Sequence, residues 1–217
     1  SFELIETMRC DHGRIARLER HLRRLADSAA YWGFAGTTAE SASAALHLFA
    51  REHAAGRWRV RLLAARTGCV RVSATPLDAP AHALGDSAAS GVSVAAEAVV
   101  IAGPAVSRND RLLFHKTTAR HSYDARRAAR PGVFDVLLFN GEGEATEFTT
   151  GNVVAEIDGA LLTPPRECGL LAGTMREQLL DAGTVAERVI TLEQLRRAAR
   201  IWHVNSVRGC TPVKLVD

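Results

Sequence analysis

Residues 18–29, with the sequence LERHLRRLADSA, decide how the first part of the chain is interpreted, because their spacing is that of a helix with one apolar face. Apolar residues recur three and four positions apart, at Leu18, Leu22, Leu25 and Ala29. Charged residues fall between them, as in an α-helix of 3.6 residues per turn that packs one side against a core. The pattern predicts an amphipathic helix that begins at Leu18 and ends near Gly33.

The segments on either side of this helix predict a small α/β domain around it. Residues 2–9 mix β-formers with polar residues and predict a strand. Thr37 followed by Glu40 is a capping-box signature for a second helix that ends before Gly56. Two further strands are expected at 57–64 and 69–73, around a turn at 66–68. The predicted element order is therefore β-α-α-β-β.

The second half of the chain is predicted to be rich in strands. Prolines, a glycine and small residues between the halves indicate a linker. We expect a small domain at 1–78, a linker at 79–90 and a larger domain at 91–217. In the larger domain, strands are expected at 92–101, 134–140, 153–162 with a bend at Asp158-Gly159, and 202–207, and helices near 122–129, from Thr174 and from Thr191. The fold class is mixed α/β (α+β).

Composition excludes several classes of protein. The chain is 47% hydrophobic and 24% charged, as in globular proteins, and no apolar run approaches the roughly 20 residues of a membrane span. Aromatic residues are only 6%, and acidic residues interleave with the basic ones, which disfavours nucleic-acid binding. Without a signal-peptide pattern we expect a cytoplasmic protein. The four cysteines are scattered and suggest no metal site, so buried reduced thiols are expected (Cys10, Cys69, Cys168 and Cys210).

Lysine is rare in this chain, since 25 of the 27 basic residues are Arg. The two lysines are Lys116 and Lys214. Only an ammonium readily loses its proton and becomes a nucleophile, so each lysine is a candidate for chemistry. Lys214 lies three residues from the end of the sequence and is of the kind most often found at a surface. Lys116 lies in a polar stretch, HKTTAR at 115–120, between an apolar run and a predicted helix.

Two more segments carry groups suited to binding a charged ligand. Glu147 lies in TEFTTGN at 146–152, after a turn at 141–143. Gly173 directly precedes a predicted helix start, where free N–H groups and the positive end of the helix dipole face an anion. Taken singly, each segment has an ordinary alternative, such as an exposed strand-end acid for Glu147.

Together, the order and spacing of these segments resemble the class IV aminotransferase family, the fold type IV pyridoxal-phosphate enzymes. The resemblance implies a large β-rich pseudo-barrel domain beside a small α/β domain, with pyridoxal 5′-phosphate as cofactor. It implies that Lys116 is the Schiff-base lysine and Glu147 the partner of the pyridine nitrogen. The phosphate contacts that it implies come from Arg24, from the backbone of Thr174 and Met175, and from Ser206.

Within the family, Lys116 followed four residues later by Arg120 is more similar to aminodeoxychorismate lyases than to branched-chain aminotransferases. Residues 2–9, FELIETMR, resemble the start of the lyase region fused behind the aminodeoxychorismate synthase component in some para-aminobenzoate enzymes. Two features differ: Ala119 stands where many lyases have Asn or Asp, and the family's first strands are missing, as expected of a piece of a longer chain or of a variant without that edge. Arg61, Arg120 or Arg208 are the candidates for binding substrate carboxylates.

The resemblance implies a 4-amino-4-deoxychorismate lyase that releases pyruvate and forms 4-aminobenzoate for folate synthesis. Two alternatives stay open: an amino-acid aminotransferase of branched-chain or D-amino acid type, and a non-catalytic homologue that keeps the fold. The family also implies a homodimer, and the chain is expected to be fused to, or to work with, a synthase component. We expect a small-molecule substrate, and neither a nucleic acid nor a membrane as partner.

Overall fold

The computed structural model describes residues 2–84 and 95–216, which divide into two units. Unit 1 comprises Ser1–Pro80 and His115–Ala119, and unit 2 comprises Ala81–Phe114 and Arg120–Asp217. Part of the expected linker and the start of the strand expected at 92–101 lie outside the described residues. The mixed fold class is confirmed.

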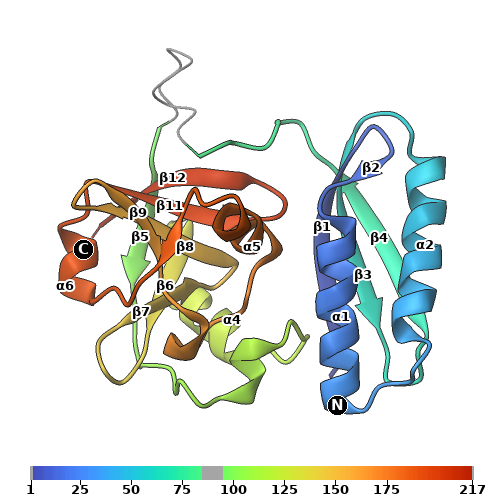
Figure 1. Cartoon of the computed structure of the whole chain (residues 1–217), viewed down its shortest axis with the longest axis horizontal. Coiled ribbons are helices and arrows are strands. Elements are labelled where there is room, and N and C mark those ends of the chain that lie inside the picture. The colour runs from blue at the N-terminus through green and yellow to red at the C-terminus, as the bar shows by residue number, and fades with distance from the viewer. Residues whose placement is uncertain (1, 85–94, 217) are drawn as a thin grey trace. The chain divides into compact units, whose positions relative to one another are not determined.

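Unit 1 is a four-stranded antiparallel sheet with two helices on one face (Figure 1). The strand order is β2-β1-β3-β4. Its elements are β1 (Leu4–Asp11), β2 (Arg14–Ile15), α1 (Leu18–Trp32), α2 (Thr38–Glu52), β3 (Arg57–Ala64) and β4 (Val70–Pro76). The predicted start of α1 and both ends of β3 are confirmed, and Gly33 ends α1 in the left-handed conformation, with φ of 65°.

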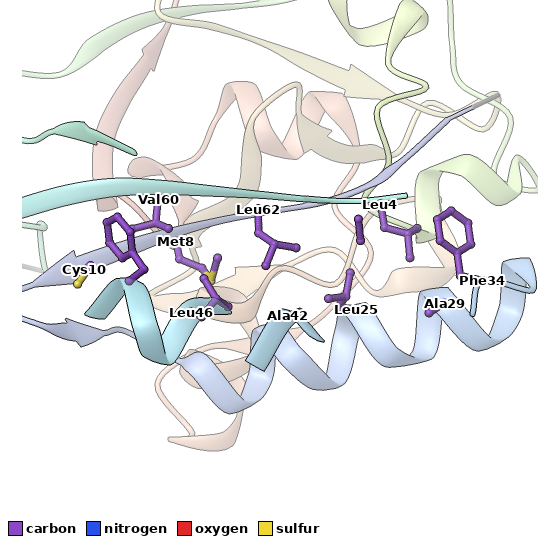
Figure 2. Close-up of a cluster of buried hydrophobic side chains, with 12 residues drawn as sticks. Leu4, Met8, Cys10, Leu25, Ala29, Phe34, Ala42, Leu46, Val60 and Leu62 are labelled. Atoms are coloured by element: carbon purple, nitrogen blue, oxygen red, sulfur yellow. The ribbon is translucent and has the colours of Figure 1, made fainter. Parts of the chain in front are cut away.

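The core of unit 1 lies between the helices and the sheet, as Figure 2 shows. Leu25 of α1 and Leu46 of α2 face Met8 of β1 and Leu62 of β3, and all four are almost fully buried. Alternate residues of each strand therefore face this core. Burial of such apolar surface, at about 25 cal/mol per Å², is the main force that holds the helices to the sheet.

Residues 115–119 pack with unit 1, whereas the expected division of the chain placed them with the large domain. They run antiparallel to the start of β1, with a bridge between Leu4 and Thr117. The backbone N–H of Ile5 donates to the carbonyl of Lys116 at 3.0 Å. This pairing joins segments more than a hundred residues apart.

Unit 2 is built on an eight-stranded sheet of order β10-β9-β8-β11-β12-β5-β6-β7. Strand β7 also pairs with β8, so the sheet closes on itself. Its strands are β5 (Glu97–Ile101), β6 (Asp135–Phe139), β7 (Ala145–Phe148), β8 (Gly151–Ile157), β9 (Ala160–Thr163), β10 (Ala186–Glu187), β11 (Arg200–Asn205) and β12 (Gly209–Leu215). This closed sheet agrees with the expected pseudo-barrel.

Three α-helices and two 3-10 turns complete the described part of unit 2. They are η1 (Arg111–Phe114), α4 (His121–Ala128), η2 (Arg166–Cys168), α5 (Thr174–Asp181) and α6 (Leu192–Arg196). The predicted start of α5 at Thr174 is confirmed, as is the capping box of α6, in which Thr191 and Gln194 bond each other's backbone N–H groups. No helix within the described ranges is both long and apolar enough to cross a membrane.

Two expectations about the fold are wrong, and one strand was not expected. Thr37 forms no capping box, because its backbone is helical (φ −79°, ψ 0°) and its side chain makes no cap hydrogen bond. Cys69 is exposed, since it lies in the turn before β4, while the other three cysteines are buried. Strand β12 was not expected, because Pro212 and Lys214 break its apolar pattern.

Candidate cofactor site

Lys116 lies in the segment that pairs with β1 in unit 1. Its side chain is half-buried, unlike a typical surface lysine. The neighbouring His115 is fixed by a 2.9 Å hydrogen bond between its Nδ1 and the hydroxyl of Ser28, and by stacking on the ring of Tyr31 at 4.4 Å. Backbone pairing and an anchored neighbour together give Lys116 a defined place in unit 1.

Arg24, on α1, is held by a buried carboxylate in unit 1. Its Nε donates to Oε1 of Glu6 at 2.9 Å and its Nη2 to Oε2 at 2.5 Å, a bidentate ion pair. His21, one turn earlier on α1, places its Nδ1 2.6 Å from the same Oε2. The Glu6 side chain is only 3% exposed. The guanidinium of Arg24 is thus oriented by β1, because bidentate pairs fix both position and plane.

The charge state of this cluster follows from its contacts. Burial alone would raise the pKa of Glu6, but Arg24 and His21 lower that pKa to about 2, so the carboxylate is ionised. Burial lowers the pKa of His21 despite the nearby Glu6, which favours the neutral ring. A neutral His21 donates its Nδ1–H to Glu6, and the cluster holds one positive and one negative charge.

Glu147 lies on β7 in unit 2 and is buried, with 4% of its surface exposed. This differs from the exposed strand-end acid considered from the sequence. The hydroxyl of Tyr123, on α4, donates to Oε1 of Glu147 at 2.7 Å. Burial and the nearby Glu147 raise the pKa of Tyr123 well above its ordinary value, so the phenol keeps its proton and remains a donor.

The start of α5 is tied to the strand that pairs with Glu147. Asn152 of β8 lies opposite Glu147 in the β7–β8 register, and its Nδ2 donates to the carbonyl of Leu171 at 2.8 Å. A Cβ at Gly173 would overlap Oδ1 of Asn152, so this close approach requires glycine. Thr174, the first residue of α5, is 1% exposed, and Met175 is half-buried. The N-terminus of the helix is therefore placed by the same hairpin as Glu147.

The turn that carries Ser206 is linked to the same hairpin. Oδ1 of Asn205 accepts from the backbone N–H groups of Val207 and Arg208 at 3.0 and 2.9 Å, which closes the turn between β11 and β12. Nδ2 of Asn205 donates to the carbonyl of Thr150 at 3.2 Å, within the β7–β8 connection. Unit 2 thus links the predicted acid to both predicted anion-binding elements, α5 and the 205–208 turn.

The three candidate substrate arginines differ in their surroundings. Arg61 is exposed on β3, on the sheet face opposite the helices of unit 1, between Thr7 and Ser73 of the neighbouring strands. The guanidinium of Arg120 donates to the carbonyl of Thr149 at 2.5 Å and lies 4.7 Å from the ring centre of Tyr123. Arg208 lies 5.4 Å from the ring centre of Phe134. Among the residues described, Arg61 is the candidate for which no ion pair or ring contact is found.

Sequence analysis missed Tyr123 and Asn152, the residues that fix Glu147 and α5. The signal for Tyr123 was weak, because it is one polar aromatic residue on a short polar helix. Asn152 was within the quoted 146–152 segment, but only the hairpin register shows that it lies opposite Glu147. Both assignments depend on tertiary contacts.

Comparisons with known proteins agree with this architecture. The sequence model of a family described as "Amino-transferase class IV" matches residues 3–216. A crystal structure described as a "Putative amino-acid aminotransferase" from Mesorhizobium loti is 37% identical, covers 100% of both chains and has a TM-score of 0.82. A solved structure with this fold, a "hypothetical aminotransferase" from Mycobacterium tuberculosis that is 22% identical with a TM-score of 0.77, is described as the "PLP-bound form", and pyridoxal 5′-phosphate (PLP) is the cofactor of the family.

Two curated relatives match shorter stretches and carry different names. A "Putative aminodeoxychorismate lyase" from Schizosaccharomyces pombe is 36% identical over 87 residues, which are 38% of this chain and 38% of the relative. A "Probable branched-chain-amino-acid aminotransferase" from Thermotoga maritima is 27% identical over 107 residues, 47% of this chain and 39% of the relative. The matches thus span well under half of these relatives. The family match covers nearly the whole sequence, and the chain belongs to the class IV aminotransferase family.

Proposed function

We propose that this chain is a pyridoxal-phosphate enzyme whose reaction is that of a 4-amino-4-deoxychorismate lyase. The observation that best supports cofactor binding lies within unit 2. There, hydrogen bonds and strand pairing connect a buried acid to two elements that we propose to bind the phosphate. Glu147 is joined through Asn152 to the start of α5 and through Thr150 to the 205–208 turn. A cofactor with a basic ring nitrogen and a phosphate needs such a pair of sites.

The groups present fit the cofactor chemically. Lys116 supplies the amine for covalent attachment, and Glu147 a buried carboxylate for the ring nitrogen. The backbone N–H groups of Thr174 and Met175 and the hydroxyl of Ser206 are donors for a phosphate, at the positive end of a helix dipole. Arg24, which Glu6 orients within unit 1, is the further phosphate contact that the family resemblance implies. When bound, the cofactor ring accepts the electron pair left at the carbon next to the substrate amine.

In the proposed reaction the protein moves one proton and holds charges in place. Lys116 would hold the cofactor through its Nζ, and once the substrate amine has taken that place the Nζ would remove the proton from the carbon bearing the amine. Glu147 keeps the ring nitrogen protonated, and Tyr123 fixes the carboxylate that does so. The leaving group departs as enolpyruvate, to which the proton held on Lys116 Nζ would be returned to give pyruvate, and 4-aminobenzoate would be released when Lys116 regains its place.

Arg61 is the arginine best placed to hold a substrate carboxylate. It projects from the sheet face opposite the apolar core, and no carboxylate pairs with it among the described residues. Arg120 is occupied by the carbonyl of Thr149, and Arg208 stacks on Phe134. We therefore assign substrate recognition first to Arg61 and retain the other two as secondary candidates.

The choice of lyase over aminotransferase is supported by the relatives and by one spacing. The relative named as a lyase has the higher identity of the two curated proteins, 36% against 27%. Arg120 follows Lys116 by four residues, a spacing similar to that of aminodeoxychorismate lyases. The second candidate is an amino-acid aminotransferase, favoured by the name of the Mesorhizobium loti structure. We also propose that the chain acts as a homodimer, with or fused to a synthase component.

A two-substrate assay distinguishes these reactions. The chain, loaded with cofactor, is incubated with enzymatically generated 4-amino-4-deoxychorismate, and pyruvate and 4-aminobenzoate are measured. In parallel it receives branched-chain or D-amino acids with a 2-oxo acid. Equal amounts of pyruvate and 4-aminobenzoate support the lyase proposal. Turnover only of the amino acids assigns the chain to the aminotransferases, and a colourless protein that binds no cofactor identifies a non-catalytic homologue.

A further inference from the structure

A second buried carboxylate in unit 2, Asp135, lies behind the hairpin that carries Glu147. Asp135 begins β6 and is fully buried. Its oxygens accept from the backbone N–H groups of Val136 and Thr150 at 2.7 and 3.1 Å, and from the hydroxyl of Thr150 at 2.5 Å. The hydroxyl of Thr149 also donates to Oδ1. Three of these donors belong to two consecutive residues.

Those two residues form the connection between β7 and β8. The register of the hairpin pairs Phe148 with Gly151, so only Thr149 and Thr150 lie between the strands. The backbone N–H of Thr149 donates to the carbonyl of Val136 at 3.0 Å, which adds a main-chain link to β6. Asp135 therefore fixes the point at which β7 turns, two residues after Glu147.

His203, on β11, completes the cluster from the far side. It is fully buried, and its Nε2 lies 3.1 Å from Oδ2 of Asp135 and 3.1 Å from the hydroxyl of Thr150. Its Nδ1 has no hydrogen-bond partner in the described part of the chain, which fits a ring that donates from Nε2. A Cβ at Gly151 would lie 2.5 Å from the His203 ring, so glycine is required for this approach.

The cluster keeps Asp135 charged. Burial would raise the pKa of Asp135, but the hydrogen bonds from His203, Thr149 and Thr150 lower that pKa to about 2. Nη1 of Arg127 lies 3.9 Å from Oδ1 of Asp135 and adds a nearby positive charge. A buried carboxylate with this many donors is rigid, because each bond must break before it can move.

Two residues of α4 and its N-terminal end also contact the Glu147 segment. Tyr123 donates to the Glu147 carboxylate, and Arg120, at the start of the same helix, donates to the carbonyl of Thr149. The Glu147 segment is thus hydrogen-bonded both to α4 and to the Asp135 cluster. Asp135 and His203 act on the Glu147 segment through their hydrogen bonds to Thr149 and Thr150.

We propose that Asp135 is a positioning residue, which aims the Glu147 carboxylate by holding the Thr149-Thr150 turn, with His203 supporting it. This inference rests on the proposed cofactor-binding function. It goes beyond that function because it makes the protonation of the cofactor ring depend on a residue that does not touch the ring. An acid that must meet one nitrogen at hydrogen-bond distance tolerates little displacement.

The test compares Asp135→Asn with two other variants of the cofactor-loaded chain. An amide leaves only one acceptor oxygen and places N–H groups against the donors of the turn. The double variant Thr149→Val/Thr150→Val removes two hydroxyl donors at nearly constant volume and leaves Asp135 in place. The control is Thr163→Val, which removes a buried hydroxyl bonded at 2.7 Å to the carbonyl of Val153, elsewhere in unit 2.

Two measurements are made, cofactor affinity and the 15N chemical shift of a labelled cofactor ring nitrogen at neutral pH. We expect Asp135→Asn to weaken binding about tenfold and to shift the ring nitrogen toward its unprotonated form. The double threonine variant should move the 15N chemical shift in the same direction but by a smaller amount. Thr163→Val should leave the chemical shift unchanged. General destabilisation would not move the nitrogen signal.

The outcomes separate the inference from the function on which it rests. If the unaltered chain binds no cofactor, the proposed function falls, and the inference with it. If the unaltered chain binds cofactor and the first two variants keep its nitrogen shift and affinity, the inference alone is overturned. Should Asp135→Asn fail to fold, the double threonine variant decides the question by itself.

Discussion

Arg24 in unit 1 and Glu147 in unit 2 are held in place by different kinds of contact. Arg24 is locked to the buried Glu6 by a bidentate ion pair. Glu147 instead accepts from the neutral phenol of Tyr123, while a different buried carboxylate, Asp135, accepts from the turn that follows Glu147. In unit 1 the proposed ligand-binding residue, Arg24, is therefore itself a member of the buried ion pair. In unit 2 the buried charge cluster is centred on Asp135, a different residue from the proposed ligand-binding Glu147. Substitutions in the two clusters should therefore affect different measured quantities.

The largest expected effect is on turnover, in Glu147→Gln. An amide cannot stabilise a protonated ring nitrogen, so we expect kcat to fall about a hundredfold or more. The free energy of unfolding should change by less than about 1 kcal/mol, because the amide oxygen still accepts from Tyr123. Steady-state kinetics and urea unfolding measure the two quantities. Glu144→Gln, nearby but bonded to Asn140, is the control and should keep its kcat. Near-normal turnover in Glu147→Gln would mean that the acid has been misplaced.

For Glu6→Gln in unit 1 we expect the main effect on stability. Removing one partner of a buried ion pair leaves the Arg24 charge uncompensated, so the free energy of unfolding should fall by about 3 kcal/mol. The matched control is Glu3→Gln, whose partner Arg71 is 60% exposed, and there we expect a loss below about 1 kcal/mol. Urea unfolding of both variants compares them directly. Equal losses would show that the buried pair contributes no more than a surface one.

Acid should destabilise both clusters in the same pH window. The pKa of Glu6 falls from 4.5 to about 2, and that of Asp135 from 3.8 to about 2. Because the folded-state pKa values are the lower ones, the unfolded chain binds more protons in between, and stability decreases as pH falls. Each carboxylate contributes about 2–3 kcal/mol that is present above pH 4.5 and is lost on approach to pH 2.

Urea unfolding as a function of pH checks this prediction. The free energy of unfolding of the unaltered chain should fall steeply between pH 4.5 and 2. That of Glu6→Gln should fall less over the same range, because this variant lacks the carboxylate whose protonation causes part of the loss. Identical pH profiles for the two proteins would show that Glu6 has an ordinary pKa in the folded state.

The smallest expected effect compares two helix starts that look alike in sequence. Thr191 forms the capping box of α6, so Thr191→Ala should lower the free energy of unfolding by about 1 kcal/mol. Thr37 makes no cap hydrogen bond, so Thr37→Ala should lower the free energy of unfolding by only about 0.3 kcal/mol. Thermal or urea unfolding can resolve the difference. A larger loss at Thr37 would show that α2 is capped in solution.

Local patterns predicted much of the fold, because they depend on residues close in sequence. The apolar spacing located α1, and Asp158-Gly159, both at positive φ, forms the turn expected between β8 and β9. The Thr37 capping box failed because the signature does not report the backbone conformation of Thr37 itself. A short motif indicates a helix start and leaves its hydrogen bonds undetermined.

The contacts that fix the candidate site could not be predicted, since they join residues far apart. Asp135 and His203 are 68 positions apart and share no motif. One signal was available: Asp135 is a lone charge within the apolar run FDVLLF, and a charge in a buried strand requires partners. The sequence does not identify those partners, because Thr149, Thr150 and His203 are brought to it only by closure of the sheet.

The most direct test of the proposed function is to identify which lysine binds the cofactor. The chain is incubated with pyridoxal 5′-phosphate, reduced with borohydride, digested and examined by mass spectrometry, with Lys116→Ala treated in parallel. The chain has only two lysines, so the result is unambiguous. We expect a reduced adduct on the peptide that contains Lys116 and no adduct on the variant. An adduct on Lys214, or none in the unaltered chain, would contradict the proposed function.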